Sequence, residues 1–213
     1  MGADLRTGGA FVTSEPTPPI PERPLLRGDR VWLRPLEERD LPAYVAGMND
    51  AEVGGMAGYK WPLSVAQATA WLQRTQEQSR SGELGFFFAV CEVGADQFIG
   101  TVWLKGVNLV DGNAELAIFM DRDHIGSGYG TDAQRALLAF AFKNLGLQRV
   151  WLTAYAANER AIRSYERLGF QHEGRLRQSW RGPRGLEDTV LMAILRDEWL
   201  QAGESAKGSP TAD

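Results

Sequence analysis

The sequence predicts a mixed α+β fold, in which one mainly antiparallel sheet flanked by helices is interrupted by a single strand-helix-strand unit. Short runs that alternate apolar and polar residues are separated by turn-length gaps, as in hairpins. One strongly periodic helical segment lies between two such runs. The chain of 213 residues, 44% of them hydrophobic, is long enough to bury one full core. We therefore expect one globular domain.

The two ends of the chain differ in composition from the middle. Residues 1–24 are rich in Gly, Ser, Thr and Pro and contain few apolar residues to bury, and residues 203–213 are mostly small and polar. We expect a disordered N-terminal tail over 1–24, a folded domain over 25–202 and a flexible C-terminal tail over 203–213. The first residues lack the basic and apolar segments of a secretory signal, so we expect a cytoplasmic protein.

Charge and composition exclude several classes of partner. A formal net charge of -4 gives no bulk attraction to nucleic acid or to an anionic membrane, and the apolar runs are too short to span a bilayer. Neither histidine has the spacing of a metal ligand, so no metal is expected. The single cysteine, Cys91, lies in an apolar run and is expected to fill the core. Four basic residues are interpreted as a solvated hairpin face: Arg175, Arg177, Arg181 and Arg184.

The first part of the domain is predicted to hold one strand and two helices. Residues 30–36 alternate as a half-buried strand does, and a helix over 40–48 follows. The glycine-containing stretch 49–62 is expected to be a long loop. A serine with a glutamine three residues later forms a capping box at the start of a helix over 65–80.

The centre of the chain is predicted to form a hairpin, a third strand and the longest apolar helix. The runs 86–93 and 98–107 are separated by a short polar turn, and 114–120 continues as a strand. Apolar residues of 128–145 recur on one helical face, and Gly146 supplies the left-handed residue that ends a helix.

The last part of the domain repeats this alternation on a smaller scale. Residues 149–155 form a strand, and 159–168 form a helix that Gly169 ends. Two final strands are predicted over 170–179 and 188–195. The strand-helix-strand unit is therefore the segment from 114 to 155.

The loop before the longest helix carries three alternating glycines, Gly126, Gly128 and Gly130. Glycines let the backbone turn sharply, so that successive N–H groups point inward where the helix dipole is positive. A phosphate or pyrophosphate binds at such a place without a lysine. Ordinary tight turns at helix starts also collect glycine, and this alternative stays open at the level of the loop alone.

Two common phosphate-binding motifs are absent from this loop and its surroundings. A Walker loop requires Gly-Lys-Ser or Gly-Lys-Thr, which the chain lacks. A dinucleotide-binding fold places an acidic residue about twenty positions after its glycines. Here that place is taken by Val-Trp-Leu-Thr-Ala-Tyr at 150–155, which contains no acid.

The chain carries instead the run Asn-Glu-Arg-Ala-Ile-Arg-Ser-Tyr-Glu-Arg-Leu-Gly-Phe at 158–170. Together with the glycine loop and with the segments 31–36 and 170–177, this run resembles the GCN5-related N-acetyltransferase (GNAT) superfamily, particularly the branch of ribosomal-protein N-terminal acetyltransferases. The resemblance spans nearly all of 25–202. The family's pyrophosphate pattern opens with Gln or Arg, where this chain has Ile125, so backbone amides are expected to make the contact there.

The resemblance implies a GNAT-like sheet in which a splayed strand pair forms the acyl-CoA site. The strand that ends at Phe119 and Met120 is expected to pair with the pantetheine arm, and a backbone amide there to polarise the thioester carbonyl. Such a fixed donor stabilises the negative charge that grows on that oxygen. The residues implied to contact acetyl-CoA are Phe119, Met120, Ile125, Gly126, Ser127, Gly128, Tyr129, Gly130, Thr131, Asn158 and Tyr165.

Two of the residues are implied to be catalytic. Tyr165 matches the family tyrosine that protonates the departing thiolate, although it shares a helical face with Ile162 and Leu168 and so also fits a core position. Glu115 matches an acidic position proposed as a base that acts through water on the acceptor ammonium. A solvated charge at the strand end explains Glu115 equally well. His124 is interpreted as a local surface or packing residue.

The resulting hypothesis is an N-acetyltransferase that moves an acetyl group from acetyl-CoA to a primary amine by direct attack in a ternary complex. The acceptor is expected to be a protein N-terminus or a small amine. The alternatives are a CoA-binding sensor or scaffold without turnover, and an acyltransferase that uses another donor such as succinyl-CoA. The resemblance also implies a homodimer that pairs through the final strands. Acidic residues near the expected acceptor site fit a cationic amine: Glu37, Glu38, Asp40, Asp50 and Glu52.

Overall fold

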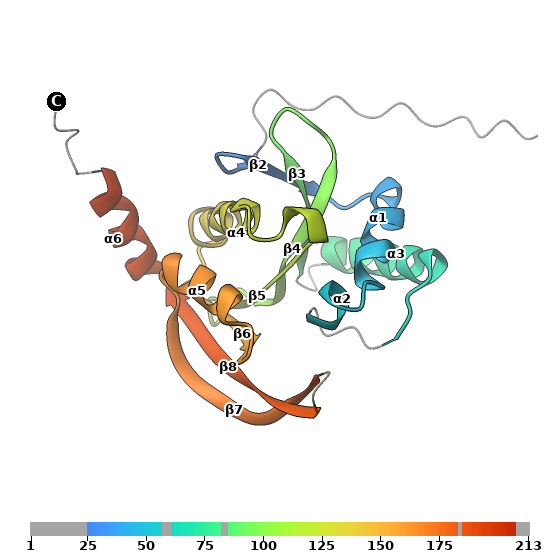
Figure 1. Ribbon diagram of the computed structural model, residues 1–213. Coiled ribbons are helices and arrows are strands. Elements are labelled where there is room, and N and C mark those ends of the chain that lie inside the picture. Colours follow the sequence, from blue (N-terminus) through green and yellow to red (C-terminus); the bar gives the residue numbers. More distant parts are fainter. Residues whose placement is uncertain (1–24, 57–60, 82–84, 183–184, 208–213) are drawn as a thin grey trace, which may run out of the picture.

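The chain folds around one eight-stranded sheet (Figure 1). The computed structural model describes residues 25–56, 61–81, 85–182 and 185–207. The strands lie in the order β1-β2-β3-β4-β5-β6-β8-β7, and all neighbours are antiparallel except β5 and β6, which are parallel. The strands are β1 (Leu26–Arg27), β2 (Val31–Pro35), β3 (Phe86–Glu92), β4 (Phe98–Asn108), β5 (Asn113–Met120), β6 (Arg149–Tyr155), β7 (Gln171–Gly182) and β8 (Gly185–Leu195).

Helices cover the two faces of the sheet, and one more helix is the last described element of the chain. The α-helices are α1 (Leu41–Met48), α2 (Val53–Met56), α3 (Val65–Ser81), α4 (Tyr129–Ala139), α5 (Glu159–Arg167) and α6 (Arg196–Lys207). Two short 3-10 turns, η1 (Glu38–Asp40) and η2 (Arg122–His124), precede α1 and α4, and a π turn, η3 (Phe140–Asn144), ends α4. No helix in the described ranges combines the length and the apolar character that crossing a membrane requires.

Two hydrophobic clusters lie on opposite faces of the sheet. One packs α4 and α5 against the central strands, with Leu137, Phe142 and Tyr165 among its buried residues. The other packs α1, α2 and α3 against the opposite face and contains Tyr44 and Phe119. Figure 1 shows α4 and α5 on one side of β4 and β5 and the first three helices on the other. The protein is therefore a three-layer structure with the sheet in the middle.

The structure confirms the predicted fold class and most of the predicted elements. Ser64 and Gln67 form the expected capping box: the Ser64 amide donates to Gln67 Oε1 at 2.9 Å, and the Gln67 amide to Ser64 Oγ at 3.2 Å. Gly146 and Gly169 have φ of +69° and +96°, as the helix ends require. Cys91 is fully buried, and burial raises the pKa of its thiol to about 12.

Several elements differ from the prediction. The stretch 49–62, expected to be a loop, contains α2, because Asp50 Oδ1 accepts hydrogen bonds from the amides of Glu52 and Val53, both at 2.9 Å. The long helix ends in a π turn, in which the Leu145 amide donates to the Phe140 carbonyl. The final strands extend beyond the predicted bounds, and the unpredicted α6 follows β8.

The predicted domain limits are only partly within the described chain. Residues 1–24, 57–60, 208–213 and Arg184 lie outside the described residues. Helix α6 runs to Lys207, beyond the predicted end of the folded domain at 202.

The feature that positions the functional site is the separation of β5 from β6. Their parallel ladder joins only Asn113–Glu115 to Arg149–Trp151. Beyond these residues β5 continues to Met120 and β6 to Tyr155 with no ladder between them. The facing backbone groups on the two edges are thus left to pair with a ligand, and this is the splayed strand pair that the resemblance implied.

Candidate active site

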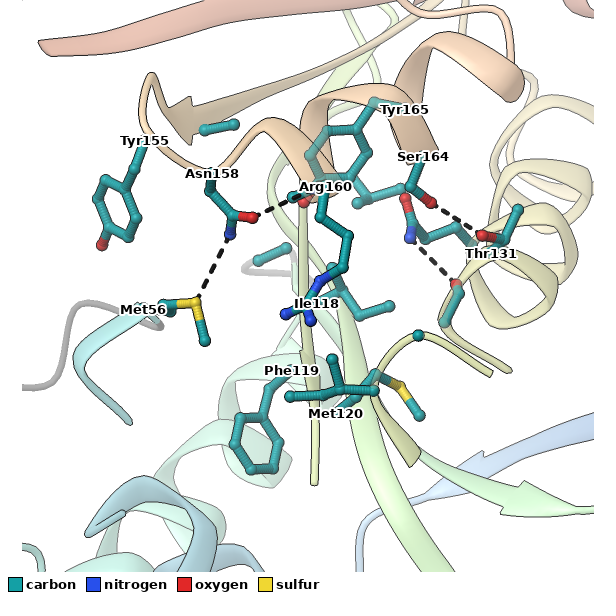
Figure 2. Close-up of a pocket in the computed structure, with 18 of the residues that line it drawn as sticks. Met56, Ile118, Phe119, Met120, Thr131, Tyr155, Asn158, Arg160, Ser164 and Tyr165 are labelled. Atoms are coloured by element: carbon teal, nitrogen blue, oxygen red, sulfur yellow. Dashed lines mark hydrogen bonds between the residues drawn. The ribbon is translucent and has the colours of Figure 1, made fainter. Parts of the chain in front are cut away.

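A cavity of about 460 Å³ lies where β5 and β6 part, between the start of α4 and the start of α5 (Figure 2). The structure brings most of the sequence-predicted residues together in its wall. Those that line the cavity are Glu115, Phe119, Met120, Ile125, Gly126, Gly128, Gly130, Thr131, Asn158 and Tyr165.

Two predicted cofactor residues, Ser127 and Tyr129, do not line the cavity. Instead, Arg30 of the β1–β2 turn braces them. Its guanidinium donates to the Ser127 carbonyl at 2.5 Å and lies 4.0 Å above the centre of the Tyr129 ring. These two loop residues therefore connect the glycine loop to the β1–β2 turn.

The glycine loop has the geometry of an anion-binding site. Gly126 and Gly128 have φ of +83° and +88°, a region that residues with a side chain rarely adopt. Gly128 is the N-cap of α4, and no side chain caps the helix. A Cβ on Gly130 would lie 3.3 Å from the side chains of Ile118 and Met120, so this glycine lets the first turn approach β5. The first amides of α4 are left for a ligand, and the helix dipole favours an anionic one.

Asp132 fixes the start of α4 against the N-terminal strand. Its buried carboxylate accepts hydrogen bonds from three successive backbone amides, those of Asp29, Arg30 and Val31, at 2.8 to 3.1 Å. A side chain on Gly28 would collide with this carboxylate, since a Cβ there would lie 2.3 Å from Asp132 Oδ2. The position of the anion-binding helix is thus set by residues about a hundred positions earlier in the chain.

The start of α5 forms the opposite wall of the cavity. Asn158 caps this helix by accepting from the Ala161 amide at 3.2 Å, and its Nδ2 lies 3.9 Å from the sulfur of Met56 on α2. Thr131 on α4 and Ser164 on α5 share a hydrogen bond of 2.8 Å between their hydroxyls. Figure 2 shows the Asn158–Met56 contact and the Thr131–Ser164 hydrogen bond as dashed lines on either side of Arg160. The two helices that flank the cavity are therefore tied together by polar side chains.

Tyr165 is both a core residue and a cavity residue. Its ring is only 9% exposed and packs against Phe170 with 5.9 Å between ring centres. Burial raises the pKa of its phenol to about 12. The two interpretations of Tyr165, packing and function, are compatible, because the residue lines the cavity while its ring fills the core.

Glu115 is paired with a lysine that the sequence analysis did not single out. Lys105 on β4 lies directly opposite Glu115 on β5, and its Nζ is 2.6 Å from Glu115 Oε1. Both side chains are partly exposed and line the cavity. Glu115 is four positions before Phe119, so both point to the face covered by α1–α3. Glu115 is thus neither a free base nor a simple solvated charge in this structure.

The acidic residues expected to attract a cationic acceptor do not line the cavity, and four of the five have partners of their own. Asp40 is buried against Arg34 at 2.7 Å, and Glu37 pairs with Arg39 at 2.5 Å. Arg122 binds both Asp50 and Glu52. Asp50 and Glu52 share a single arginine, so the group keeps a net negative charge, and its expected role in attracting a cationic acceptor stays a prediction.

Sequence reasoning also missed other polar residues of the cavity, among them Arg160, Arg167 and Gln134. Figure 2 shows Arg160 reaching from α5 into the cavity toward β5. No carboxylate in the described chain pairs with Arg160, so its guanidinium is available to an anion. Arg160 stands two residues after the helix cap Asn158, and this position in the quoted motif is the signal that could have identified it.

Sequence comparison finds N-acetyltransferases among the relatives of this chain. A putative ribosomal N-acetyltransferase, YdaF of Bacillus subtilis, is 32% identical over 100 residues, which cover 47% of this chain and 55% of the relative. A spermidine N(1)-acetyltransferase of Escherichia coli K12 is 30% identical over 172 residues, covering 80% of this chain and 88% of the relative.

The fold and the family follow from two further matches. The crystal structure of a spermidine N-acetyltransferase from Vibrio cholerae, in complex with CoA and spermine, superposes with a TM-score of 0.71 at 24% identity, over 80% of this chain and 98% of that one. The family model for the acetyltransferase (GNAT) domain matches residues 30–171. The chain therefore belongs to the GNAT family of N-acetyltransferases.

Proposed function

We propose that this protein transfers an acetyl group from acetyl-CoA to a primary amine in a ternary complex. The single observation that carries the proposal is the cavity between β5 and β6, which joins an anion-binding helix start on one face of the sheet to a carboxylate on the other. The GNAT family membership of the chain supports the same reaction.

The residues of the cavity fit a CoA thioester. The positive φ of Gly126 and Gly128 and the uncapped first turn of α4 suit a pyrophosphate. Arg160 adds a cation that has no carboxylate partner among the described residues. The free edge of β5 suits the amides of a pantetheine arm. Acetyl-CoA supplies an acyl group that is activated as a thioester. Beside it, Asn158 and Tyr165 would hold the arm and its sulfur end.

The acceptor amine would approach from the side of the sheet that carries α1–α3, where Glu115 and Lys105 lie. A protonated amine must lose a proton before it attacks, and Glu115 would hold that ammonium or a water that takes its proton. Relatives named for spermidine and for ribosomal substrates support a small amine or a protein N-terminus as the acceptor.

The test is a screen of acceptors and donors with the full chain. Spermidine, other small amines and peptides with free N-termini are incubated with acetyl-CoA, and released thiol and acetylated product are measured. Acetylated product supports the proposal and identifies the acceptor class. Tight binding of acetyl-CoA without turnover of any amine would favour the sensor or scaffold, and faster turnover of succinyl-CoA than of acetyl-CoA would favour the other donor.

Tyr165→Phe is expected to lower kcat about 100-fold with a verified acceptor, the low end of the range for general acid catalysis. The phenylalanine keeps the packing against Phe170 but removes the proton donor. Because the pKa of Tyr165 is about 12, the phenol stays protonated at neutral and mildly alkaline pH. The checks are steady-state kinetics and thermal unfolding. An unchanged kcat in a normally folded variant would remove Tyr165 from the acid role.

The homodimer expected from the family resemblance stays part of the proposal. Light scattering over a wide concentration range measures it, and a monomeric mass throughout would contradict it.

A further inference from the structure

Among the described residues that line the cavity, Gln134 is the one with a buried side-chain acceptor that has no hydrogen-bond partner. It lies on α4, one turn after the glycine loop, and is only 3% exposed. Its Nε2 donates to the Gly130 carbonyl at 3.0 Å, which fixes the orientation of the amide. The other atom of this amide, Oε1, is buried without a hydrogen-bond partner among the described residues.

A buried acceptor without a partner costs free energy, and native proteins rarely keep one unless a ligand or water completes it. Gln134 lines the cavity, so the missing donor can come from whatever the cavity binds. An apolar residue at this position would avoid the penalty, which makes the glutamine a candidate binding residue.

The chemistry of Oε1 restricts the ligand group. A carbonyl oxygen accepts hydrogen bonds and cannot donate them, so it repels phosphate oxygens and requires an N–H or O–H donor. The phosphates are already provided for by the amides that follow Gly128. The donors that stand between the pyrophosphate and the sulfur of a CoA thioester belong to the pantetheine arm, which contains two secondary amides and one hydroxyl group.

Gln134 lies next to the proposed pyrophosphate site, where that arm would begin. Its Nε2 contacts Gly130 of the proposed pyrophosphate site, and it lines the same cavity as Tyr165, the residue proposed to act at the sulfur. The linked hydroxyls of Thr131 and Ser164 lie in the same wall. We propose that Gln134 Oε1 accepts a hydrogen bond from a secondary amide N–H of the pantetheine arm and so helps to select and position the acyl donor. This inference rests on the proposed function.

The test compares the affinity of wild type, Gln134→Leu and Gln134→Met for acetyl-CoA and for S-acetyl-4′-phosphopantetheine, which lacks the adenosine part. Both variants are expected to bind both ligands about tenfold more weakly, as for one lost hydrogen bond with a desolvated partner. Binding of 3′,5′-ADP is expected to stay unchanged. Without ligand, the variants are expected to unfold at or above the wild-type temperature, because the buried unpaired acceptor is gone.

The control is Gln148→Leu, which removes an exposed glutamine that lies outside the cavity and makes a similar hydrogen bond. Gln148 Nε2 also donates to a glycine carbonyl, that of Gly146, at 2.9 Å.

If both Gln134 variants fold and bind acetyl-CoA as wild type does, the inference is wrong. If the loss appears with acetyl-CoA and not with the phosphopantetheine ligand, the donor lies in the adenosine part, which also overturns it. If Gln134→Leu does not fold, the affinities of Gln134→Met alone decide the test. If the wild type binds neither acetyl-CoA nor S-acetyl-4′-phosphopantetheine, the proposed function itself is wrong.

Discussion

The double variant Gly128→Asp, Gly130→Asp is expected to lose at least ~100-fold in affinity for acetyl-CoA. Two unit charges 4 Å apart interact by about 4 kcal/mol at an effective dielectric constant of 20, and about 1.4 kcal/mol corresponds to a tenfold change in affinity. Carboxylates at the start of α4 would repel a pyrophosphate held by the first amides of that helix. A thermal-shift titration with acetyl-CoA measures the effect.

The matched control for this variant is Gly146→Asp. Gly146 also has a positive φ, +69°, and open space around its Cβ position, but it lies at the far end of the same helical segment. It therefore introduces similar backbone strain and one of the two added charges, away from the cavity. Equal affinities of the folded double variant and the control would show that the loop is only a turn.

The second large effect is expected for Asp132→Ala, which should lower the free energy of unfolding by about 2 to 4 kcal/mol. The change leaves three backbone amides, at Asp29, Arg30 and Val31, without their charged acceptor. It also releases α4 from the β1–β2 turn, so the affinity for acetyl-CoA is expected to fall as well. Chemical denaturation and the thermal-shift titration measure the two effects.

Asp123→Ala is the control for this prediction. Asp123 is an exposed aspartate of η2, close to the same loop, and is expected to change stability by less than ~0.5 kcal/mol on replacement, as for an ordinary surface residue. If the two variants unfold at the same denaturant concentration, the carboxylate of Asp132 does not hold the helix in the way described.

The elements that were correctly predicted depend on neighbours in the sequence. The capping box of Ser64 and Gln67 spans three residues, and the left-handed ends at Gly146 and Gly169 are properties of single residues. The glycine loop belongs to the same class, because the positive φ of Gly128 and the helix start after it are encoded within a few positions. Local physics therefore predicted the mixed α+β fold class and the backbone geometry of the glycine loop, while anion binding by this loop stays a prediction.

The features that sequence reasoning missed depend on contacts between distant segments. The pairing of Lys105 with Glu115 follows from the register of β4 on β5, which a single strand pattern does not reveal. The bracing of the loop by Arg30 and the anchoring of the N-terminal strand by Asp132 join positions about a hundred residues apart. The cationic partners of Asp40, Asp50 and Glu52 were missed for the same reason, because they come from other elements.

Gln134 shows a different limit of sequence reasoning. Its position on the buried face of α4 is predictable from helical periodicity, but a glutamine there does not indicate which of its two polar atoms has a partner. Only the bond of Nε2 to Gly130 and the lack of a described donor for Oε1 separate the two atoms. The chemical character of this wall was therefore visible only in the folded protein.

The most direct test of the central claim, an acyl-CoA site between β5 and β6, is an isothermal titration of the wild-type chain with acetyl-CoA. We expect saturable binding at one site per chain, with the affinity decreasing as salt screens the attraction between the phosphates and the cavity cations. The absence of any binding by the folded protein up to millimolar acetyl-CoA would contradict the assignment of the cavity and the proposed function with it.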